Sequence, residues 1–273
     1  MDVRTALLQG TKLLEDASIA VPRLTCEVLL AHAMRRDRVY LFAHPEQELA
    51  EVEWLHYGRY LHERLQGKPT QYITKRQEFY GREFRVSPDV LIPRPETEHV
   101  VEVALKLPKA ARILDIGAGS GAIAATLQLE TGAEVFATEI SPAAALVAAG
   151  NARRLGARVD FIVCDLASAI GPRSIDLLVS NPPYVPLRER DGLQREVRDF
   201  EPHTALFGGE SGFDVYDLIV ADAPRVLRAG GWIVMELGFG TANHVRELLR
   251  DWSDVQVHPD LAGIPRVIAA KRR

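Results

Sequence analysis

From about residue 94 to its end, the sequence alternates between short apolar runs and amphipathic helical patterns. Strands are predicted at residues 112–116, 134–139, 159–164, 175–180, 232–236, 255–257 and 266–270, and helices at 95–107, 122–129, 142–155, 213–227 and 242–250. A steady succession of strand, helix and strand is typical of a parallel sheet. We therefore predict an α/β fold, with a doubly wound, mostly parallel seven-stranded sheet covered by helices on both faces.

The first third of the chain shows helical patterns without strands. Apolar residues recur at helical spacing in residues 3–14, after Pro22, and in residues 50–65. Residues 78–86 alternate around a glycine, which is typical of a short hairpin. We expect an all-α N-terminal domain (1–76), a hairpin linker (77–92) and the α/β domain (93–273).

Composition excludes several classes of protein. The net charge is −4, which argues against a protein whose main task is to grip nucleic-acid phosphates. The two cysteines, Cys26 and Cys164, lie far apart among apolar residues, so we interpret both as core residues, and no spacing suggests a zinc site. No apolar run is long enough for a signal peptide or a membrane span, so we expect no membrane partner and a reducing cytoplasm.

A glycine-rich turn follows the first predicted strand of the α/β domain. It reads Asp115-Ile116-Gly117-Ala118-Gly119-Ser120-Gly121, and its glycines let the backbone approach a ligand closely at a helix N-terminus. Glu139 ends the next predicted strand, where an acidic residue often binds ribose hydroxyls. The two features together predict a nucleoside site, although a glycine turn by itself can be purely structural.

The spacing of the turn favours S-adenosylmethionine over a dinucleotide. Dinucleotide turns usually read G-x-G-x-x-G, whereas this one reads G-x-G-x-G. Asp115 at the mouth of the turn would repel a pyrophosphate but would suit the cationic methionine moiety. Asp165, after the third strand, is placed to accept from the adenine amino group, or else to cap a helix.

Asn181-Pro182-Pro183-Tyr184 follows the fourth predicted strand. Two prolines remove two backbone donors and hold the segment extended. The segment therefore offers an amide side chain, a free carbonyl and an aromatic ring, which together could cradle a planar NH2 group. Since the glycine turn lies at the same strand edge of this topology, both motifs are expected to line one crevice.

Such a cradle suits methyl transfer to an amide or aryl-amino nitrogen, which is a poor nucleophile. We expect the Asn181 side-chain oxygen and the Pro182 carbonyl to accept hydrogen bonds from the nitrogen, and Tyr184 to stack on the planar group or exclude water. These bonds strengthen as the nitrogen becomes acidic during transfer. No strong general base is required.

Several segments resemble the PrmC/HemK family of protein-(glutamine-N5) methyltransferases. The resemblance runs through nearly the whole chain, and it is carried by residues 71–73, 78–81, 90–98, 113–121, 180–184, 200–202, 208–212 and 236–240. Its most specific part is the combination of Ile-Pro-Arg-Pro-Glu-Thr-Glu at residues 92–98 with Asn-Pro-Pro-Tyr at residues 181–184. It implies that the substrate is the glutamine of the Gly-Gly-Gln motif in class 1 peptide-chain release factors, and that the N-terminal domain helps to hold the release factor. It also implies that residues 117–121, Glu139, Leu166 and Asn181 contact S-adenosylmethionine, and that residues 181–184 hold the glutamine.

Three other classes of function stay open at this point. An adenine-N6 methyltransferase could use the same cradle after base flipping, whereas a dinucleotide oxidoreductase and a non-catalytic S-adenosylmethionine-binding module fit the motifs less well. Arg94 could anchor a ligand carboxylate or pair with Glu96 or Glu98, and Phe239 could touch the substrate. The loop over residues 185–211 is long enough to suggest a functional role.

Overall fold

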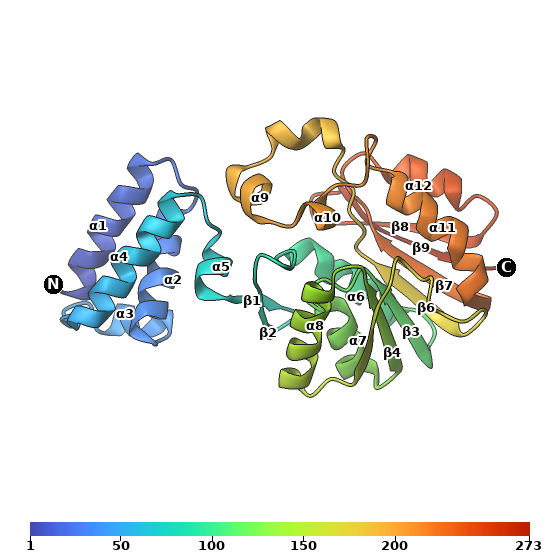
Figure 1. Ribbon diagram of the computed structural model, residues 1–273, viewed down its shortest axis with the longest axis horizontal. Helices are drawn as coiled ribbons and strands as arrows, with labels where there is room; N and C mark the ends of the chain where they lie inside the picture. Colours follow the sequence, from blue (N-terminus) through green and yellow to red (C-terminus); the bar gives the residue numbers. More distant parts are fainter. The chain divides into compact units, whose positions relative to one another are not determined.

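The computed structural model describes all residues, 1–273. It separates into two compact units (Figure 1). The smaller one contains Met1–Arg76 and Gln194–Phe200, and the larger one contains Gln77–Leu193 and Glu201–Arg273. None of the helices combines the length and the apolar composition that a membrane-spanning helix needs.

The smaller unit is built from helices around one apolar core. Its helices are α1 (Val3–Asp16), α2 (Pro22–Met34), α3 (Arg38–Ala43), α4 (Glu51–Leu65), α5 (Thr70–Thr74) and α9 (Arg195–Phe200). Asp2 caps α1, because its side chain accepts a hydrogen bond from the Thr5 N–H at 2.8 Å. Leu14, Leu29 and Tyr57 are fully buried where the first, second and fourth helices meet.

A segment from the long loop belongs to this unit. Glu196 of α9 forms an ion pair with Arg64 of α4 at 2.6 Å, and the Arg64 side chain is 7% exposed. Residues 194–200 therefore pack with the helical unit, although they are far from it in sequence. This is unexpected, because the sequence offers only a short helical pattern there.

The larger unit begins with a hairpin and continues as a sheet with helices. The hairpin strands are β1 (Arg76–Phe79) and β2 (Arg82–Arg85). The sheet strands are β3 (Arg112–Ile116), β4 (Glu134–Glu139), β5 (Val159–Val163), β6 (Ile175–Ser180), β7 (Leu227–Glu236), β8 (Ser253–Pro259) and β9 (Pro265–Lys271). The helices are η1 (Pro95–Thr97), α6 (Glu98–Lys106), α7 (Ala122–Thr131), α8 (Pro142–Leu155), η2 (Leu187–Gly192), α10 (His203–Leu206), α11 (Asp214–Val226) and α12 (Ala242–Leu248).

The strand order is β5-β4-β3-β6-β7-β9-β8, and only β9 pairs antiparallel with its neighbours. The order reverses between β3 and β6, as the sequence predicts for the two motifs. Side chains alternate between the two faces, so Ile113 packs with α6, α7 and α8, whereas Leu114 packs with α11 and α12. Figure 1 shows these two sets of helices on opposite faces of the sheet. The predicted doubly wound, mostly parallel seven-stranded sheet is confirmed.

Candidate active site

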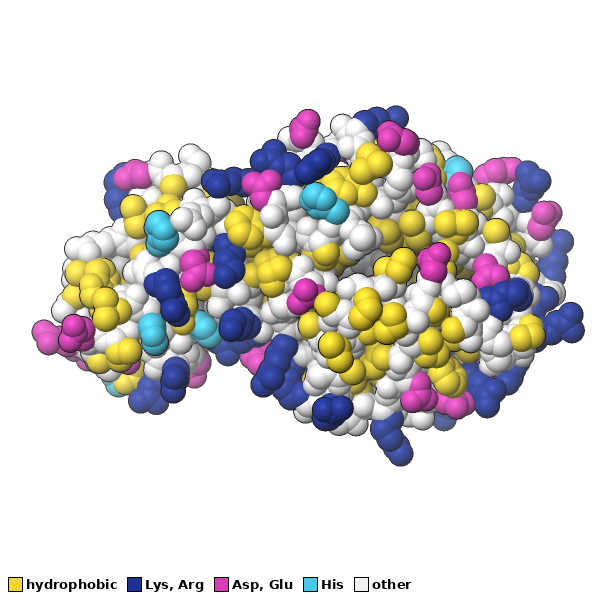
Figure 2. Space-filling view, in the orientation of Figure 1, with side chains coloured by type: hydrophobic (Ala, Val, Ile, Leu, Met, Phe, Trp, Pro, Cys, Tyr) yellow, Lys and Arg dark blue, Asp and Glu magenta, His cyan; other side chains and the backbone are white.

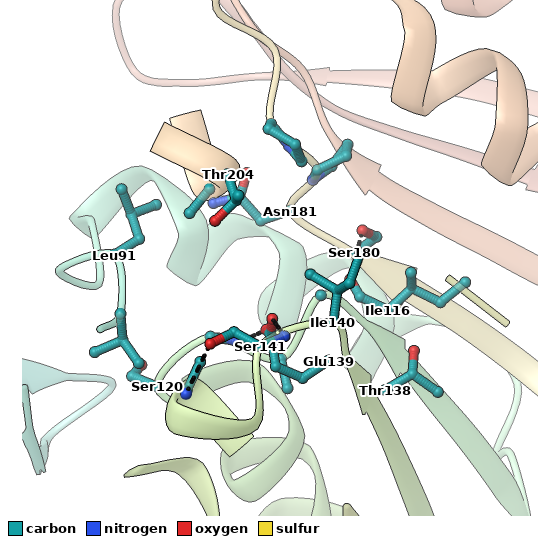
Figure 3. Close-up of a pocket in the computed structure, with 18 of the residues that line it drawn as sticks. Leu91, Ile116, Ser120, Thr138, Glu139, Ile140, Ser141, Ser180, Asn181 and Thr204 are labelled. Carbon is teal, nitrogen blue, oxygen red and sulfur yellow. Dashed lines mark hydrogen bonds between the residues drawn. The ribbon is translucent and has the colours of Figure 1, made fainter. Parts of the chain in front are cut away.

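A cavity of about 390 Å³ opens at the carboxyl ends of the parallel strands. Residues from the glycine turn, from the ends of β4, β5 and β6, from the 89–97 segment and from α10 line it. Figure 2 shows hydrophobic side chains around a hollow on this unit, and Figure 3 shows Ser120, Glu139 and Ser141 opposite Asn181 and Thr204. The size and the switch-point position are typical of a small-molecule site.

The glycine turn leaves room for a ligand. Gly117 and Gly119 have φ angles of +77° and +53°, and a Cβ at either position would meet no atom within 4 Å. Gly121 also has a positive φ, but a Cβ there would lie 3.1 Å from the Ala148 Cβ. The first two glycines therefore face open space, whereas the third permits close packing of the turn on α8.

Glu139 fixes the shape of the turn from the neighbouring strand. Its carboxylate accepts from the Gly119 N–H at 2.8 Å and from the Ser141 N–H at 3.0 Å. Each oxygen keeps a second acceptor position, because a carboxylate oxygen can accept more than one hydrogen bond. Glu139 also lines the cavity, so this carboxylate has the capacity to accept from ribose hydroxyls as well.

Asp115 does not lie at the mouth of the turn, where the sequence analysis placed it. Its side chain is fully buried beneath the turn and accepts from the Ala124 N–H of α7 at 3.1 Å. Burial, with a smaller contribution from the nearby Glu139 charge, raises the pKa of this carboxyl to about 7, against the lowering effect of the hydrogen bond from Ala124. The correction follows from strand alternation, since Asp115 lies between Leu114 and Ile116 and points to the α7 face.

Asp165 and Leu166 both line the cavity, as expected. Asp165 is exposed and begins a turn rather than a helix, so the alternative reading as a helix cap is wrong. Leu166 has a φ of +43°, which is unusual for a residue with a side chain. Cys164 also lines the cavity and is half-buried, so only Cys26 is the core cysteine that we expected.

Asn181, Pro182 and Pro183 line the cavity across from the glycine turn. The Asn181 Nδ2 group donates to the Thr97 hydroxyl at 3.1 Å, and its Oδ1 atom has no partner within the protein. No group of the protein donates to the Pro182 carbonyl. The segment therefore presents two free acceptors, as the sequence analysis predicts for an amino-group cradle.

The glycine-rich segment 208–212 holds this cradle from behind. A Cβ on Gly208 would lie 2.5 Å from the Pro183 carbonyl oxygen, and one on Gly212 would lie 2.5 Å from the Tyr184 carbonyl oxygen. The Val185 N–H donates to the Leu206 carbonyl at 2.9 Å. These close contacts explain why glycines occupy both positions.

Tyr184 does not line the cavity. Its ring lies against Gly238, where a Cβ would come within 2.5 Å of the ring, and its hydroxyl donates to the Glu236 carboxylate at 3.4 Å. Burial raises the pKa of the Tyr184 hydroxyl, and the Glu236 charge adds to the rise. The expected stacking of Tyr184 on the planar group is therefore wrong, because Gly238 and Glu236 hold the ring outside the cavity wall, where it supports the cradle.

Arg94 lines the cavity but pairs with neither Glu96 nor Glu98. It forms an ion pair with Glu201 at 2.5 Å, and the Glu201 side chain is 1% exposed. Glu98 instead accepts from the Tyr80 N–H at 2.8 Å and so fixes the hairpin turn. Phe239 is 88% exposed and does not line the cavity.

The contacts of three supporting residues are not predicted from the sequence. Thr97 and Glu236 contact the 181–184 segment, and Asn151 of α8 donates to the Ser120 carbonyl at 2.9 Å. Thr97 belongs to the 93–98 segment, which the family resemblance places at the border of the pocket, but its bond to Asn181 is not expected. Glu236 is an acidic residue at the end of an otherwise apolar strand, and Asn151 is an amide in an alanine-rich helix, so the sequence carries a signal for each of them.

The cavity wall fits S-adenosylmethionine. The space beside Gly117 and Gly119 would accept a ligand backbone, Glu139 would accept from ribose hydroxyls, and Asp165 with Leu166 would border the adenine. The free acceptors of Asn181 and Pro182 lie across the same cavity, where an amino group could be held. The arrangement can thus bring a methyl donor and an NH2 group together.

Comparison with known proteins agrees with this chemistry. Residues 5–74 match the family model "PrmC N-terminal domain", and residues 97–196 match "Methyltransferase small domain". A release factor glutamine methyltransferase from Koribacter versatilis is 49% identical, covering 100% of this chain and 99% of its own length. One from Nitratidesulfovibrio vulgaris is 40% identical, covering 95% and 91%.

Solved structures share the fold at low identity. A methyltransferase from Pyrococcus furiosus is 17% identical, with a TM-score of 0.56 over 74% of this chain and 93% of that one. Such similarity concerns the architecture of the α/β unit alone. The family follows from the full-length relatives: the chain belongs to the release factor glutamine methyltransferases.

Proposed function

We propose that this protein transfers a methyl group from S-adenosylmethionine to the side-chain amide nitrogen of the glutamine in the Gly-Gly-Gln motif of class 1 release factors. Family membership supports the reaction and the substrate. The observation that carries the proposal is the pair of free acceptors on Asn181 and Pro182 at the cavity wall. As part of the same proposal, the enzyme acts in the cytoplasm and does not bind nucleic acid directly.

Bound S-adenosylmethionine supplies an electrophilic methyl group on a sulfonium leaving group. The residues of the glycine turn and Glu139 would hold the donor, with Asp165 and Leu166 at the adenine. Asp115 would act indirectly, since its carboxyl supports the first turn of α7 from beneath. These residues position the donor at the strand edge, and none of them has to act as a base. The nitrogen becomes strongly acidic as it receives the methyl group, so it would lose one proton to water, with S-adenosylhomocysteine as the leaving group.

The Asn181 Oδ1 atom and the Pro182 carbonyl would accept hydrogen bonds from the two N–H groups of the glutamine amide. Both bonds strengthen as positive charge develops on that nitrogen, so they stabilise the transition state more than the ground state. Pro183 would border the amide plane, and Tyr184 would support the segment through its contact with Gly238. Arg94 would border the substrate entrance while it stays paired with Glu201.

The predicted domains complete the proposal. Residues 1–76 would recognise the release factor, the 77–92 hairpin would link the domains, and residues 93–273 would catalyse the transfer. The 185–211 loop would assist recognition, because its α9 segment packs with the helical unit.

Label transfer tests the proposed substrate. The protein is incubated with methyl-labelled S-adenosylmethionine and, in separate reactions, a purified class 1 release factor, tRNA and double-stranded DNA. Label is expected on the release factor alone. Label on nucleic acid alone would contradict this proposal and would favour an adenine-N6 methyltransferase instead.

A further inference from the structure

Glu236 is a buried carboxyl that the reaction described above does not use. It ends β7, is 2% exposed, and its Oε2 atom makes no hydrogen bond. Burial raises its pKa to about 7, while the neighbouring Thr97 and Tyr184 hydroxyls oppose the rise as donors. A buried carboxyl with few partners is costly, so its position calls for a physical reason.

Thr97 is a second buried polar residue beside the 181–184 segment, and its hydroxyl contacts Asn181. Thr97 is 5% exposed, and its oxygen accepts the hydrogen bond from the Asn181 Nδ2 group at 3.1 Å. A hydroxyl has one proton to donate and two acceptor positions. With the Asn181 amino group donating to it, the Thr97 oxygen is the acceptor in this contact.

This polarity decides which end of the Asn181 amide faces the cavity. The amide has a donor end and an acceptor end of nearly the same shape, so packing alone does not orient it. With Nδ2 held by Thr97, Oδ1 is the end left for a ligand. The opposite orientation would present an NH2 group to the substrate NH2 group, and the cradle would repel its guest.

The same carboxyl also reaches the other end of the cradle. The Tyr184 hydroxyl donates to the Glu236 Oε1 atom at 3.4 Å. Glu236 itself does not line the cavity, so it cannot touch the reacting atoms. Its contacts place it behind the 181–184 segment, where it can act only through its neighbours.

We propose that Thr97 and Glu236 are positioning residues that hold the Asn181 amide with its oxygen toward the substrate nitrogen. Thr97 holds the Asn181 amino group, and Glu236 holds the far end of the segment through the Tyr184 hydroxyl. This inference rests on the proposed function, because it assigns a role within the same site.

Thr97→Val tests the inference, because valine keeps the shape and removes the hydroxyl. We expect kcat for the release factor to fall about 10- to 100-fold, because the Asn181 acceptor stays but is no longer oriented, which costs less than its removal. The Kd for S-adenosylmethionine should stay within about threefold of wild type. Thr97→Ser, which keeps the hydroxyl, should restore kcat to within about threefold. Thr126→Val is the matched control, because Thr126 is a buried threonine of α7 whose hydroxyl has no partner.

A double-mutant cycle identifies the residue through which Thr97 acts. In single-turnover reactions, Thr97→Val combined with Asn181→Ala should be no slower than Asn181→Ala alone. A further slowing, an unchanged kcat for Thr97→Val, or loss of S-adenosylmethionine binding in that variant would each overturn the inference. Failure of the wild-type protein to methylate a release factor would instead overturn the proposed function.

NMR supplies a readout that does not depend on activity. The side-chain NH2 resonances of Asn181 are identified by their disappearance in Asn181→Ala. They should shift in Thr97→Val and in Glu236→Gln, and stay in place in Thr97→Ser and Thr126→Val. Unchanged resonances in Thr97→Val would contradict the hydrogen bond on which the inference depends.

Discussion

The carboxylate of Glu139 accepts a hydrogen bond from the Gly119 N–H at 2.8 Å, so the end of β4 holds the glycine turn that follows β3. The same carboxylate lines the cavity, which gives it two tasks: to shape the turn and to bind the donor. Glu139→Ala removes both, and we expect the Kd for S-adenosylmethionine, measured by calorimetry, to rise about 10- to 100-fold.

The control for this prediction lies at the other end of the same strand. Glu134 is exposed and pairs with Arg112, so Glu134→Ala should leave the Kd unchanged. Equal affinity of wild type and Glu139→Ala would refute the role assigned to Glu139.

Gly238 provides a second prediction, because its backbone lies against the Tyr184 ring. Gly238→Ala would bring a Cβ within 2.5 Å of the ring Cδ2 atom, so Tyr184 and the cradle must move. We expect methyl transfer to slow at least about tenfold, with a smaller change in the Kd for S-adenosylmethionine. Gly150→Ala on α8 meets nothing within 4 Å and should be neutral; a Gly238→Ala enzyme as fast as wild type would show that Tyr184 need not stay in place.

Asp115 predicts a specific dependence of stability on pH. Its folded pKa of about 7 lies above the ordinary value of 3.8, so between these values the folded state holds more protons than the unfolded state. The contribution of Asp115 to stability is therefore fully present below about pH 4 and is lost as the pH rises through 7. Asp115→Asn should remove a slope of up to about 1.4 kcal/mol per pH unit from the free energy of unfolding over this range.

Urea titrations at several pH values measure this slope. In Asp115→Asn the free energy of unfolding should still decline with rising pH, but less steeply. The remaining decline comes from Glu236, whose pKa is also raised to about 7 in the folded state. Asp251→Asn, at a side chain that is 89% exposed, is the control and should not alter the slope. If the free energy of unfolding of Asp115→Asn varied with pH in parallel with that of wild type, the raised pKa of Asp115 would be contradicted.

The ion pair of Arg94 and Glu201 predicts that breaking a buried pair lowers the free energy of unfolding more than breaking an exposed pair does. Arg94→Ala takes the cation away from a carboxylate that is 1% exposed, which should lower the free energy of unfolding by about 3 kcal/mol. Arg112→Ala breaks a pair whose side chains are 43% and 49% exposed, and the expected loss is below about 1 kcal/mol. Equal losses in the two variants would show that burial of Glu201 does not matter.

The sheet is predictable from the sequence because strand periodicity is a local signal. The predicted bounds of β3, Arg112 to Ile116, agree with the structure, whereas α3 and α5 are too short to show a helical period and are not predicted. The predicted start of β7 is residue 232 instead of Leu227, because two glycines interrupt the apolar run at positions 230 and 231. Elements with a clear local pattern were thus predictable, and those held by tertiary contacts were not.

The residues of the candidate site also differ in how well the sequence predicts them. Asn181 and Glu139 lie in motifs and could be found, whereas Thr97 meets Asn181 across 84 residues of sequence. Asp115 belongs to the predicted turn, but its side chain is buried rather than at the mouth, because it alternates with Leu114 and Ile116 along β3 and α7 covers it. Contacts between segments far apart in the sequence, such as that of Thr97 with Asn181, are the part of the site that the sequence does not predict.

Tandem mass spectrometry of the release factor tests the central claim most directly. After reaction with wild-type enzyme, the peptide that contains Gly-Gly-Gln should gain one methyl group on the glutamine side chain. The Asn181→Ala substitution removes the amide that the cradle requires. After reaction with this variant, the modified fraction of the peptide should fall at least about 100-fold at equal S-adenosylmethionine occupancy. A methyl group on any other residue, or equal modification by Asn181→Ala, would contradict the account.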